Sequence, residues 1–228
     1  MKILTHIEMP DLERDITTAY PGIKIEYLKS DFVTNCRIDG EILITIANRK
    51  TGLENILRSE NALRWIHLFG TGVDCLPLNL IGEKILTNSK GTSSDAIAEW
   101  VFAMLLSAAK NLPASWIKDV PDKTYNRNMQ LLKKTTLAIA GYGTIGQSIA
   151  KRALAFDMKV QVLTRQPRNT LQGPIVHTSN WKDLVTDADH LVLALPLTPD
   201  TNKILNYQTM SMLKDGVHLI NVARGGFN

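Results

Sequence analysis

Three glycines at fixed spacing lie between a predicted strand and a predicted helix. The strand is Thr135–Ala140, the helix is Gln147–Phe156, and the segment between them reads GxGxxG. Gly141 would permit a tight turn, Gly143 would let the backbone approach a pyrophosphate, and Gly146 would let the helix pack on the strand. The helix N-terminus would then present free N–H groups to the phosphates. This strand–turn–helix context favours dinucleotide binding over a chance glycine turn.

The next predicted strand, Lys159–Leu163, ends in a segment that contains no acidic residue. An Asp or Glu about 20 residues past the glycines normally bonds the ribose hydroxyls of NAD. Thr164 stands there instead, followed by Arg165 and Arg168. A carboxylate would repel a phosphate on the ribose, whereas guanidinium groups would attract it. The segment therefore favours NADP over NAD, the alternative being two solvated arginines on a surface loop.

Strands and helices alternate along the first half of the chain, which predicts a mostly parallel sheet with helices on both faces. The expected strands are Ile3–Ile7, Ile23–Tyr27, Glu41–Ile46, Leu63–Leu68 and Ile85–Thr87, and the expected helices are Leu12–Tyr20 and Gly52–Ser59. A polar cluster at 88–94 then marks a boundary. We expect an α/β protein with two doubly wound parallel-sheet domains, a flavodoxin-like domain at 1–92 and a Rossmann nucleotide-binding domain at 93–228.

A long apolar helix is expected directly after this boundary. The segment Asp95–Lys110 is apolar on most of its circumference, which is typical of a helix buried on several sides, such as one wedged between two domains. Ser94 is a suitable N-cap, and Pro113 ends the helix.

Composition argues against several other classes of protein. The net charge is 26 − 22 = +4, and the basic residues are scattered, so no nucleic-acid partner is expected. No apolar run reaches the roughly 18 residues of a membrane helix, and the first residues make a poor signal peptide, so we expect a cytoplasmic protein with no membrane partner. Two isolated thiols, Cys36 and Cys75, are expected to be packing residues, and no metal site is expected.

Four stretches of the sequence resemble the D-isomer-specific 2-hydroxyacid dehydrogenases, and together they span nearly the whole chain. They are GTGVD at 70–74, Asn88…Gly91…Ala98-Glu99, the glycine motif with Ala155–Met158, and LPLTPDT at 195–201 followed by INVARG at 220–225. The last combination is highly specific. The TRQPR segment at 164–168 is most similar to the NADPH-dependent glyoxylate/hydroxypyruvate reductase branch of the family.

The resemblance implies an activity and a role for each matching residue. The family moves hydride between a nicotinamide and C2 of a small 2-keto or 2-hydroxy acid. Backbone N–H groups around Thr71 and Gly72, in the substrate domain, would hold the substrate carboxylate. Arg224 would bind that carboxylate and polarise the keto oxygen, although it could instead pair with a nearby carboxylate. Pro196 and Leu197 would flank the nicotinamide ribose.

The full set of cofactor-binding residues implied by the resemblance is Gly141, Tyr142, Gly143, Thr144, Ile145, Gly146, Thr164, Arg165, Arg168, Pro196, Leu197, Thr201 and Ala223. The family commonly forms dimers through the long helix and the nucleotide domain, and the apolar helix Asp95–Lys110 is compatible with a homodimer.

The sequence departs from the family at the catalytic proton donor. The family's His, which protonates the alkoxide, and the Glu that holds it both follow the NVARG stretch, where only GGFN stands here. The five histidines, His6, His67, His177, His190 and His218, all precede Arg224, and we expect His190 and His218 to be packing or edge residues. Asp157 stands where the family usually has Gly, and Cys75 where a polar residue is common.

These departures lead us to expect a C-terminally truncated, incomplete second domain. Truncation would leave Val217–Val222 as an unpaired edge strand and an apolar face on the first domain. Three hypotheses stay open: a truncated NADPH-dependent dehydrogenase, a non-catalytic nucleotide-binding relic or regulatory protein, and a reading-frame artefact without a stable fold.

Overall fold

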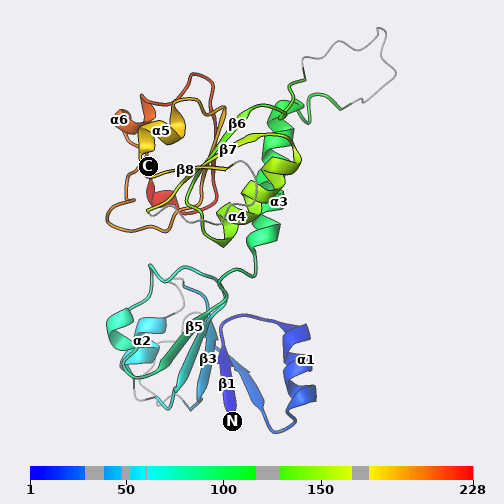
Figure 1. Cartoon of the computed structure of the whole chain (residues 1–228). Helices are drawn as coiled ribbons and strands as arrows, with labels where there is room; N and C mark the ends of the chain where they lie inside the picture. Colours follow the sequence, from blue (N-terminus) through cyan, green and yellow to red (C-terminus); the bar gives the residue numbers. More distant parts are fainter. Residues whose placement is uncertain (29–38, 48–51, 60, 117–128, 166–174, 228) are drawn as a thin grey trace. The chain divides into compact units, whose positions relative to one another are not determined.

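The computed structural model describes residues 1–28, 39–47, 52–59, 61–116, 129–165 and 175–227 (Figure 1). Arg168 and Cys36 lie outside these ranges. The chain divides into two compact units, Met1–Lys90 and Gly91–Asn228, and the division falls inside the polar segment 88–94.

The described part of the first unit contains a five-stranded sheet in the order β2-β1-β3-β4-β5, and every pairing in it is parallel. Its elements are β1 (Lys2–Thr5), α1 (Pro10–Ala19), β2 (Lys24–Tyr27), β3 (Ile42–Thr45), α2 (Leu53–Arg58), β4 (Trp65–Leu68), the 3-10 helix η2 (Leu78–Leu80) and β5 (Ile85–Asn88). This is the flavodoxin-like strand order, so the predicted class of this domain is confirmed.

The described part of the second unit contains a parallel sheet in the order β10-β9-β6-β7-β8. Its elements are α3 (Ser94–Ala109), β6 (Thr136–Ala140), α4 (Thr144–Ala155), β7 (Lys159–Leu163), β8 (Ile175–Thr178), α5 (Trp181–Val185), β9 (His190–Leu193), α6 (Tyr207–Met210), β10 (His218–Asn221) and the 3-10 helix η3 (Gly225–Phe227). Counted from β6, the order is 3-2-1-4-5, which confirms the Rossmann prediction.

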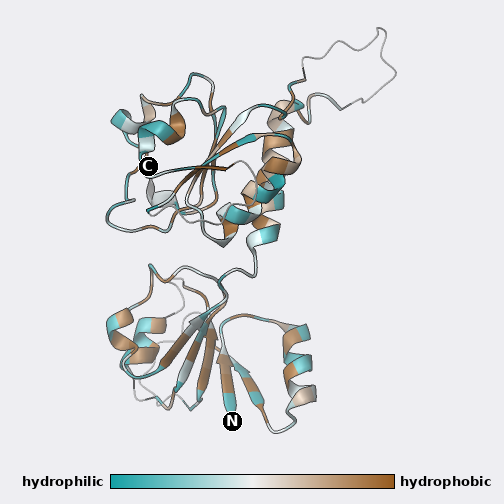
Figure 2. Ribbon diagram, in the orientation of Figure 1, coloured by the Kyte–Doolittle hydropathy of each residue, from teal (hydrophilic) through white to brown (hydrophobic). Residues whose placement is uncertain are grey.

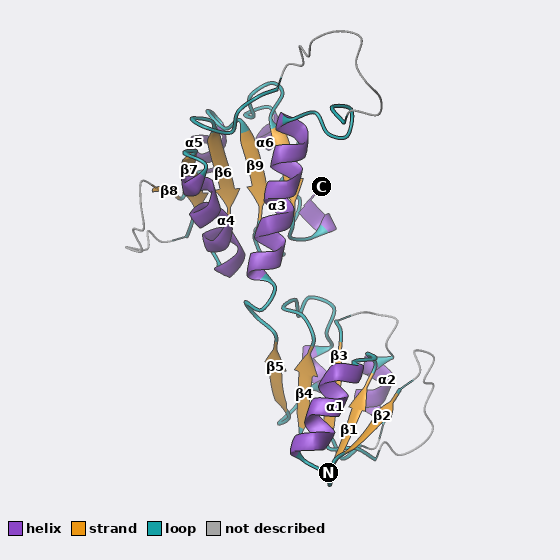
Figure 3. Ribbon diagram, turned by 90° about the vertical axis from the view of Figure 1, so that its right-hand side faces the viewer, coloured by secondary structure: helices purple, strands orange, loops and turns teal. Residues whose placement is uncertain are grey.

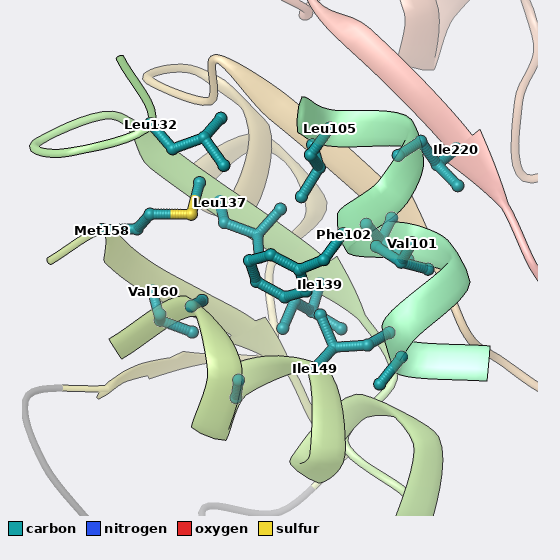
Figure 4. Close-up of a cluster of buried hydrophobic side chains, with 14 of the residues drawn as sticks. Val101, Phe102, Leu105, Leu132, Leu137, Ile139, Ile149, Met158, Val160 and Ile220 are labelled. Atoms are coloured by element: carbon teal, nitrogen blue, oxygen red, sulfur yellow. The ribbon is translucent and has the colours of Figure 1, made fainter. Parts of the chain in front are cut away.

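Apolar side chains cover both faces of this second sheet. All five residues of β6 are buried, and successive residues point to opposite faces. On one face Leu137 and Ile139 pack with α3 and α4, which lie side by side over the sheet (Figures 3 and 4). On the other face Ala138 and Ala140 pack near α5. Strands buried on both faces read as apolar runs, and Figure 2 accordingly shows them mainly brown.

Helices α3 and α4 begin and end one to three residues before the bounds predicted from the sequence. The N-cap of α3 is Ser93, so the predicted cap Ser94 is wrong by one position; Ser94 begins the helix and is buried. Helix α4 begins at Thr144, inside the glycine motif. After α4, Asp157 has the left-handed φ of 54°, the conformation for which the family usually has Gly.

Several apolar side chains of the described strands are exposed. Leu219 of β10, at the end of the described sheet, is 36% exposed. In the first unit, Trp65 and Ile85 are register partners on β4 and β5 and are 39% and 63% exposed. These exposed side chains all belong to strands: β10 in the second unit, and β4 and β5 in the first.

Asp189 joins the beginnings of two central strands of the second sheet. Its carboxylate accepts hydrogen bonds from the Thr136 amide at 2.9 Å and from Lys214 Nζ at 2.6 Å. Burial would raise the pKa of Asp189, but the hydrogen bonds from Lys214 and Thr136 outweigh it and hold the pKa below its usual value. A carboxyl with a lowered pKa stabilises the fold above its unfolded pKa, and that stability is lost as the pH falls through the folded pKa.

We therefore expect Asp189→Asn to lower the free energy of unfolding at pH 7 by about 2 kcal/mol, because charge-assisted hydrogen bonds are weakened. The difference from the wild type should shrink as the pH falls from about 4 through the lowered pKa of Asp189, because the carboxyl group then becomes protonated and uncharged like the amide. Urea unfolding at pH 7 and at pH 3 measures both values. Asp187→Asn is the control, since Asp187 is exposed and close in sequence; an equal loss in that variant would contradict the assignment.

Candidate functional site

Two glycines of the motif occupy positions where a side chain would not fit. Gly141 has a φ of +105°, and a Cβ on it would lie 2.7 Å from the carbonyl oxygen of Ala194. A Cβ on Gly146 would overlap the carbonyl oxygen of Gly141. Gly141 thus makes the tight turn after β6, and Gly146 lets α4 pack against that turn, as the motif predicts.

Gly143 lies in open space between these two glycines. A Cβ on Gly143 would meet nothing within 4 Å, and both Gly143 and Thr144 are exposed. Gly143 is the N-cap of α4 and supplies no side-chain cap, while its carbonyl accepts from the Gln147 amide at 2.9 Å. The first N–H groups of a helix have no partner within it. This open, uncapped helix N-terminus fits the pyrophosphate of a dinucleotide.

The loop after β7 carries the residues predicted to distinguish NADP from NAD. Thr164 is half-buried, and its amide donates to the Thr178 carbonyl at 2.9 Å. Arg165 is exposed, with Nη2 3.8 Å from Oδ2 of Asp200, which is exposed too. Such an exposed ion pair is weak and leaves the guanidinium accessible to a stronger anion.

The loop after β9 is held in shape by one hydroxyl. Thr201 Oγ1 donates to the Pro196 carbonyl at 2.7 Å and accepts from the Thr198 amide at 2.8 Å. Pro196 is exposed and Leu197 is half-buried. Thr201 therefore fixes the backbone that presents Pro196 and Leu197.

Arg224 follows β10 in a turn that is closed by Asn221. Asn221 Oδ1 accepts from the Ala223 amide at 2.9 Å, and Asn221 Nδ2 donates to the Arg224 carbonyl at 2.8 Å. The Arg224 side chain is exposed, and its Nη1 donates to the Ala223 carbonyl at 2.9 Å. Asn221 is not among the residues predicted from the sequence, although an Asn that bonds its own backbone two residues on is a recognisable turn signal.

Contacts bring these four loops to one edge of the second sheet. Parallel strands end at the same edge, and β6, β7, β9 and β10 are all parallel. The Gly141 turn lies against Ala194, and Arg165 reaches Asp200. Gly226 lies against Leu197: a Cβ built on the glycine would be 3.2 Å from Cδ2 of Leu197. The carboxyl edge is where open α/β sheets bind ligands.

The predicted substrate residues Thr71 and Gly72 belong to the first unit. They follow β4, where Gly70 has a φ of +147° and the Thr71 carbonyl accepts from Asn88 Nδ2 at 3.1 Å. The loop therefore lies at the carboxyl edge of the first sheet.

Two histidines of the second unit, His190 and His218, lie at the edge of the sheet opposite to Arg224. His190 and His218 begin β9 and β10, at the opposite edge of the sheet, with ring centroids 6.0 Å apart. Burial and the neighbouring His218 hold the pKa of His190 below its usual value, and the opposing effect of Asp189 is smaller. His190 is buried and His218 is on the outer strand of the described sheet, so their interpretation as packing or edge residues is confirmed.

Three further expectations concern absences or packing. Cys75 is exposed, so the expectation that it is a packing residue is wrong; it lies in an exposed loop beside Asp74. Among the described residues, no group of three or more His, Cys, Asp or Glu side chains could hold a metal ion. In the same residues, none of the helices has the length and apolar character needed to cross a membrane.

Comparisons with known proteins agree with this geometry. The family profile described as "D-isomer specific 2-hydroxyacid dehydrogenase, NAD binding domain" matches residues 102–228. Hydroxypyruvate reductase from Thermotoga maritima is 30% identical over 206 residues, which cover 88% of this chain and 66% of that protein. D-3-phosphoglycerate dehydrogenase from Methanocaldococcus jannaschii is 30% identical over 197 residues, which cover 82% of this chain and 37% of that protein.

Among solved structures, the TT0316 protein from Thermus thermophilus has a TM-score of 0.79 at 27% identity, covering 100% of this chain and 75% of that one. The profile match spans more than half of the chain. The chain belongs to the D-isomer-specific 2-hydroxyacid dehydrogenase family, and its second unit contains the family's NAD-binding domain.

Proposed function

We propose that the protein reduces a small 2-keto acid to the 2-hydroxy acid, with NADPH as the cofactor. The observation that carries this proposal is the carboxyl edge of the second sheet, where the glycine turn, the loop around Arg165 and the segment after Arg224 each contact the loop after β9. NADPH would supply the hydride to C2 of the keto acid, and a water molecule would supply the proton that the resulting alkoxide takes up. The chain would hold the pyrophosphate on α4 and orient the keto acid.

Arg224 is the proposed catalytic residue. Its exposed guanidinium offers a planar fork of donors that matches a carboxylate and can also polarise the neighbouring keto oxygen. The Asn221 turn fixes the backbone that carries it. The proposed substrate contacts in the first unit are the backbone N–H groups around Thr71 and Gly72.

Glyoxylate and hydroxypyruvate are the proposed substrates. The similarity to a hydroxypyruvate reductase from Thermotoga maritima supports this class, whereas the similarity to a D-3-phosphoglycerate dehydrogenase points to a phosphorylated three-carbon acid. Oxidation of NADPH at 340 nm, with glyoxylate, hydroxypyruvate and 3-phosphohydroxypyruvate supplied in turn, separates the two. Turnover with either of the first two acids, abolished by Arg224→Met, is the expected result. Turnover with the phosphorylated acid alone would contradict the substrate assignment.

Binding without turnover is the second candidate function. It is favoured by the positions of His190 and His218, which lie at the edge opposite to Arg224 and are unavailable to protonate a substrate there. The same assay decides between the two, since a binding protein would show saturable NADPH binding and no oxidation of NADPH with any of the three acids.

The NADP preference predicts the effect of reversing one charge. Arg165→Asp should weaken NADPH binding by roughly 10- to 100-fold and leave NADH binding within about threefold, because a carboxylate repels the ribose phosphate. Titration of nicotinamide fluorescence measures both affinities. Lys159→Asp is the matched control, since it makes the same charge change at the other end of β7. An unchanged ratio of the two affinities would contradict the role of Arg165.

A homodimer through α3 is also proposed. Trp100 is 51% exposed, and the exposed Ala96 and Ala103 share its helical face. A large apolar side chain beside small ones is suited to helix packing between two copies. Trp100→Lys should convert a dimer to a monomer in sedimentation experiments. Tyr207→Lys, at a side chain that is 92% exposed on α6, should leave the mass unchanged; a monomeric wild-type protein would contradict the proposal.

A further inference from the structure

The second residue of the glycine motif is held by contacts from two different elements. The ring of Tyr142 lies edge-on against the ring of His177, with centroids 5.2 Å apart and an interplanar angle of 88°. The Tyr142 carbonyl accepts from Gln147 Nε2 of α4 at 3.2 Å. The ring also packs against the α3–α4 core. Tyr142 therefore links the glycine turn to strand β8, although β7 lies between β6 and β8 in the sheet.

The end of β8 also holds the loop that is proposed to recognise the ribose phosphate. In the parallel register, His177 lies beside Val162 and Thr178 beside Leu163. The Thr178 carbonyl accepts from the Thr164 amide at 2.9 Å. Two successive residues of one strand thus contact the pyrophosphate turn, through Tyr142, and the loop that carries Arg165.

Hydrogen bonding within the described residues does not explain why residue 177 is a histidine. Within the described residues, neither Nδ1 nor Nε2 of His177 has a hydrogen-bond partner, and both atoms are buried. Buried nitrogens without partners destabilise a fold, so an apolar side chain would be more favourable if space filling were the only requirement. The flat imidazole ring instead makes the edge-to-face contact with Tyr142, an arrangement that aromatic rings favour.

We infer that His177 is a positioning residue for the dinucleotide. Its ring holds Tyr142, and so holds the Gly141–Gly143 turn in the form that receives the pyrophosphate. A turn that is already ordered loses less conformational entropy when a ligand binds, which raises the affinity. The inference rests on the proposed function, since it concerns the affinity of the site for NADPH.

A double-mutant cycle on the whole chain tests this inference, with NADPH affinity measured by nicotinamide fluorescence. His177→Ala should raise the Kd about fivefold, and His177→Phe, which keeps a flat ring, should change it less than about twofold. Tyr142→Ala should also weaken binding, and adding His177→Ala to it should have little further effect, because the two rings act together. Circular dichroism and thermal unfolding verify that each variant is folded.

His218→Ala is the matched control, because it removes an imidazole from another edge-to-face ring pair. His218 lies on β10 and His177 on β8, the two outermost strands of the described sheet. It should leave the Kd unchanged. If His177→Ala fails to fold, His177→Leu takes its place, and a weakening of about fivefold is expected for it too. Unchanged affinity in these variants, or effects of Tyr142→Ala and His177→Ala that multiply fully, would overturn the inference while the wild type still binds. A folded wild-type chain that does not bind NADPH would overturn the proposed function, and this inference with it.

Discussion

Gly143→Ala should abolish tight binding of NADPH and leave the stability of the chain almost unchanged. The added methyl group meets no protein atom within 4 Å, and the φ of −78° suits alanine. The same methyl group would occupy the space above the α4 N-terminus into which the phosphates must come. Losing about two charge-assisted hydrogen bonds weakens binding by roughly 100-fold.

This prediction requires two measurements on one variant. Calorimetric titration with NADPH gives the affinity, and urea unfolding should give a free energy within about 0.5 kcal/mol of the wild type. Gly22→Ala is the control, since a Cβ at Gly22 also meets nothing within 4 Å but lies in the first unit. Unweakened NADPH binding by Gly143→Ala would show that the phosphates bind elsewhere.

Gly146→Ala should have the opposite profile, with its main effect on the fold. A Cβ there overlaps the Gly141 carbonyl oxygen and lies 3.4 Å from Cγ2 of Ile139, which is fully buried. Overpacking costs about 3 kcal/mol when a backbone atom must move, and the better helix propensity of alanine offsets about 1 kcal/mol. We expect a net loss of about 2 kcal/mol in the free energy of unfolding.

Urea unfolding of the Gly146→Ala chain measures this loss, and Gly143→Ala serves as its control because the two glycines belong to the same turn. An unfolding free energy equal to that of the wild type would mean that α4 does not pack against the turn as described. The pair of variants therefore separates the glycine required by the ligand from the glycine required by the fold.

The sequence was sufficient to predict the elements whose cause is local. The apolar run before Gly141 predicted a strand, and the alternation of strands with helices implied mostly parallel sheets. The glycine spacing identified the turn, since each glycine has a separate steric reason. The short helices α5 and α6 were not predicted, although Asn180 and Asn206 cap their N-termini with side-chain hydrogen bonds.

Other features depend on residues distant in the sequence and could not be predicted from it. The contact between Tyr142 and His177 joins a loop to a strand that is separated from it by β7. The ion pair of Arg165 with Asp200 depends on how two loops meet at the sheet edge. The exposure of Cys75 follows from the course of the loop after β4, which composition does not determine.

The central claim is that the carboxyl edge of the second sheet binds NADPH, and one titration tests it most directly. The folded wild-type chain would be titrated with NADPH and, in parallel, with NADH, while nicotinamide fluorescence is recorded. We predict saturable binding at one site per chain, tighter for NADPH than for NADH. A chain with a folded circular-dichroism spectrum and no saturable binding of either nucleotide would contradict the account.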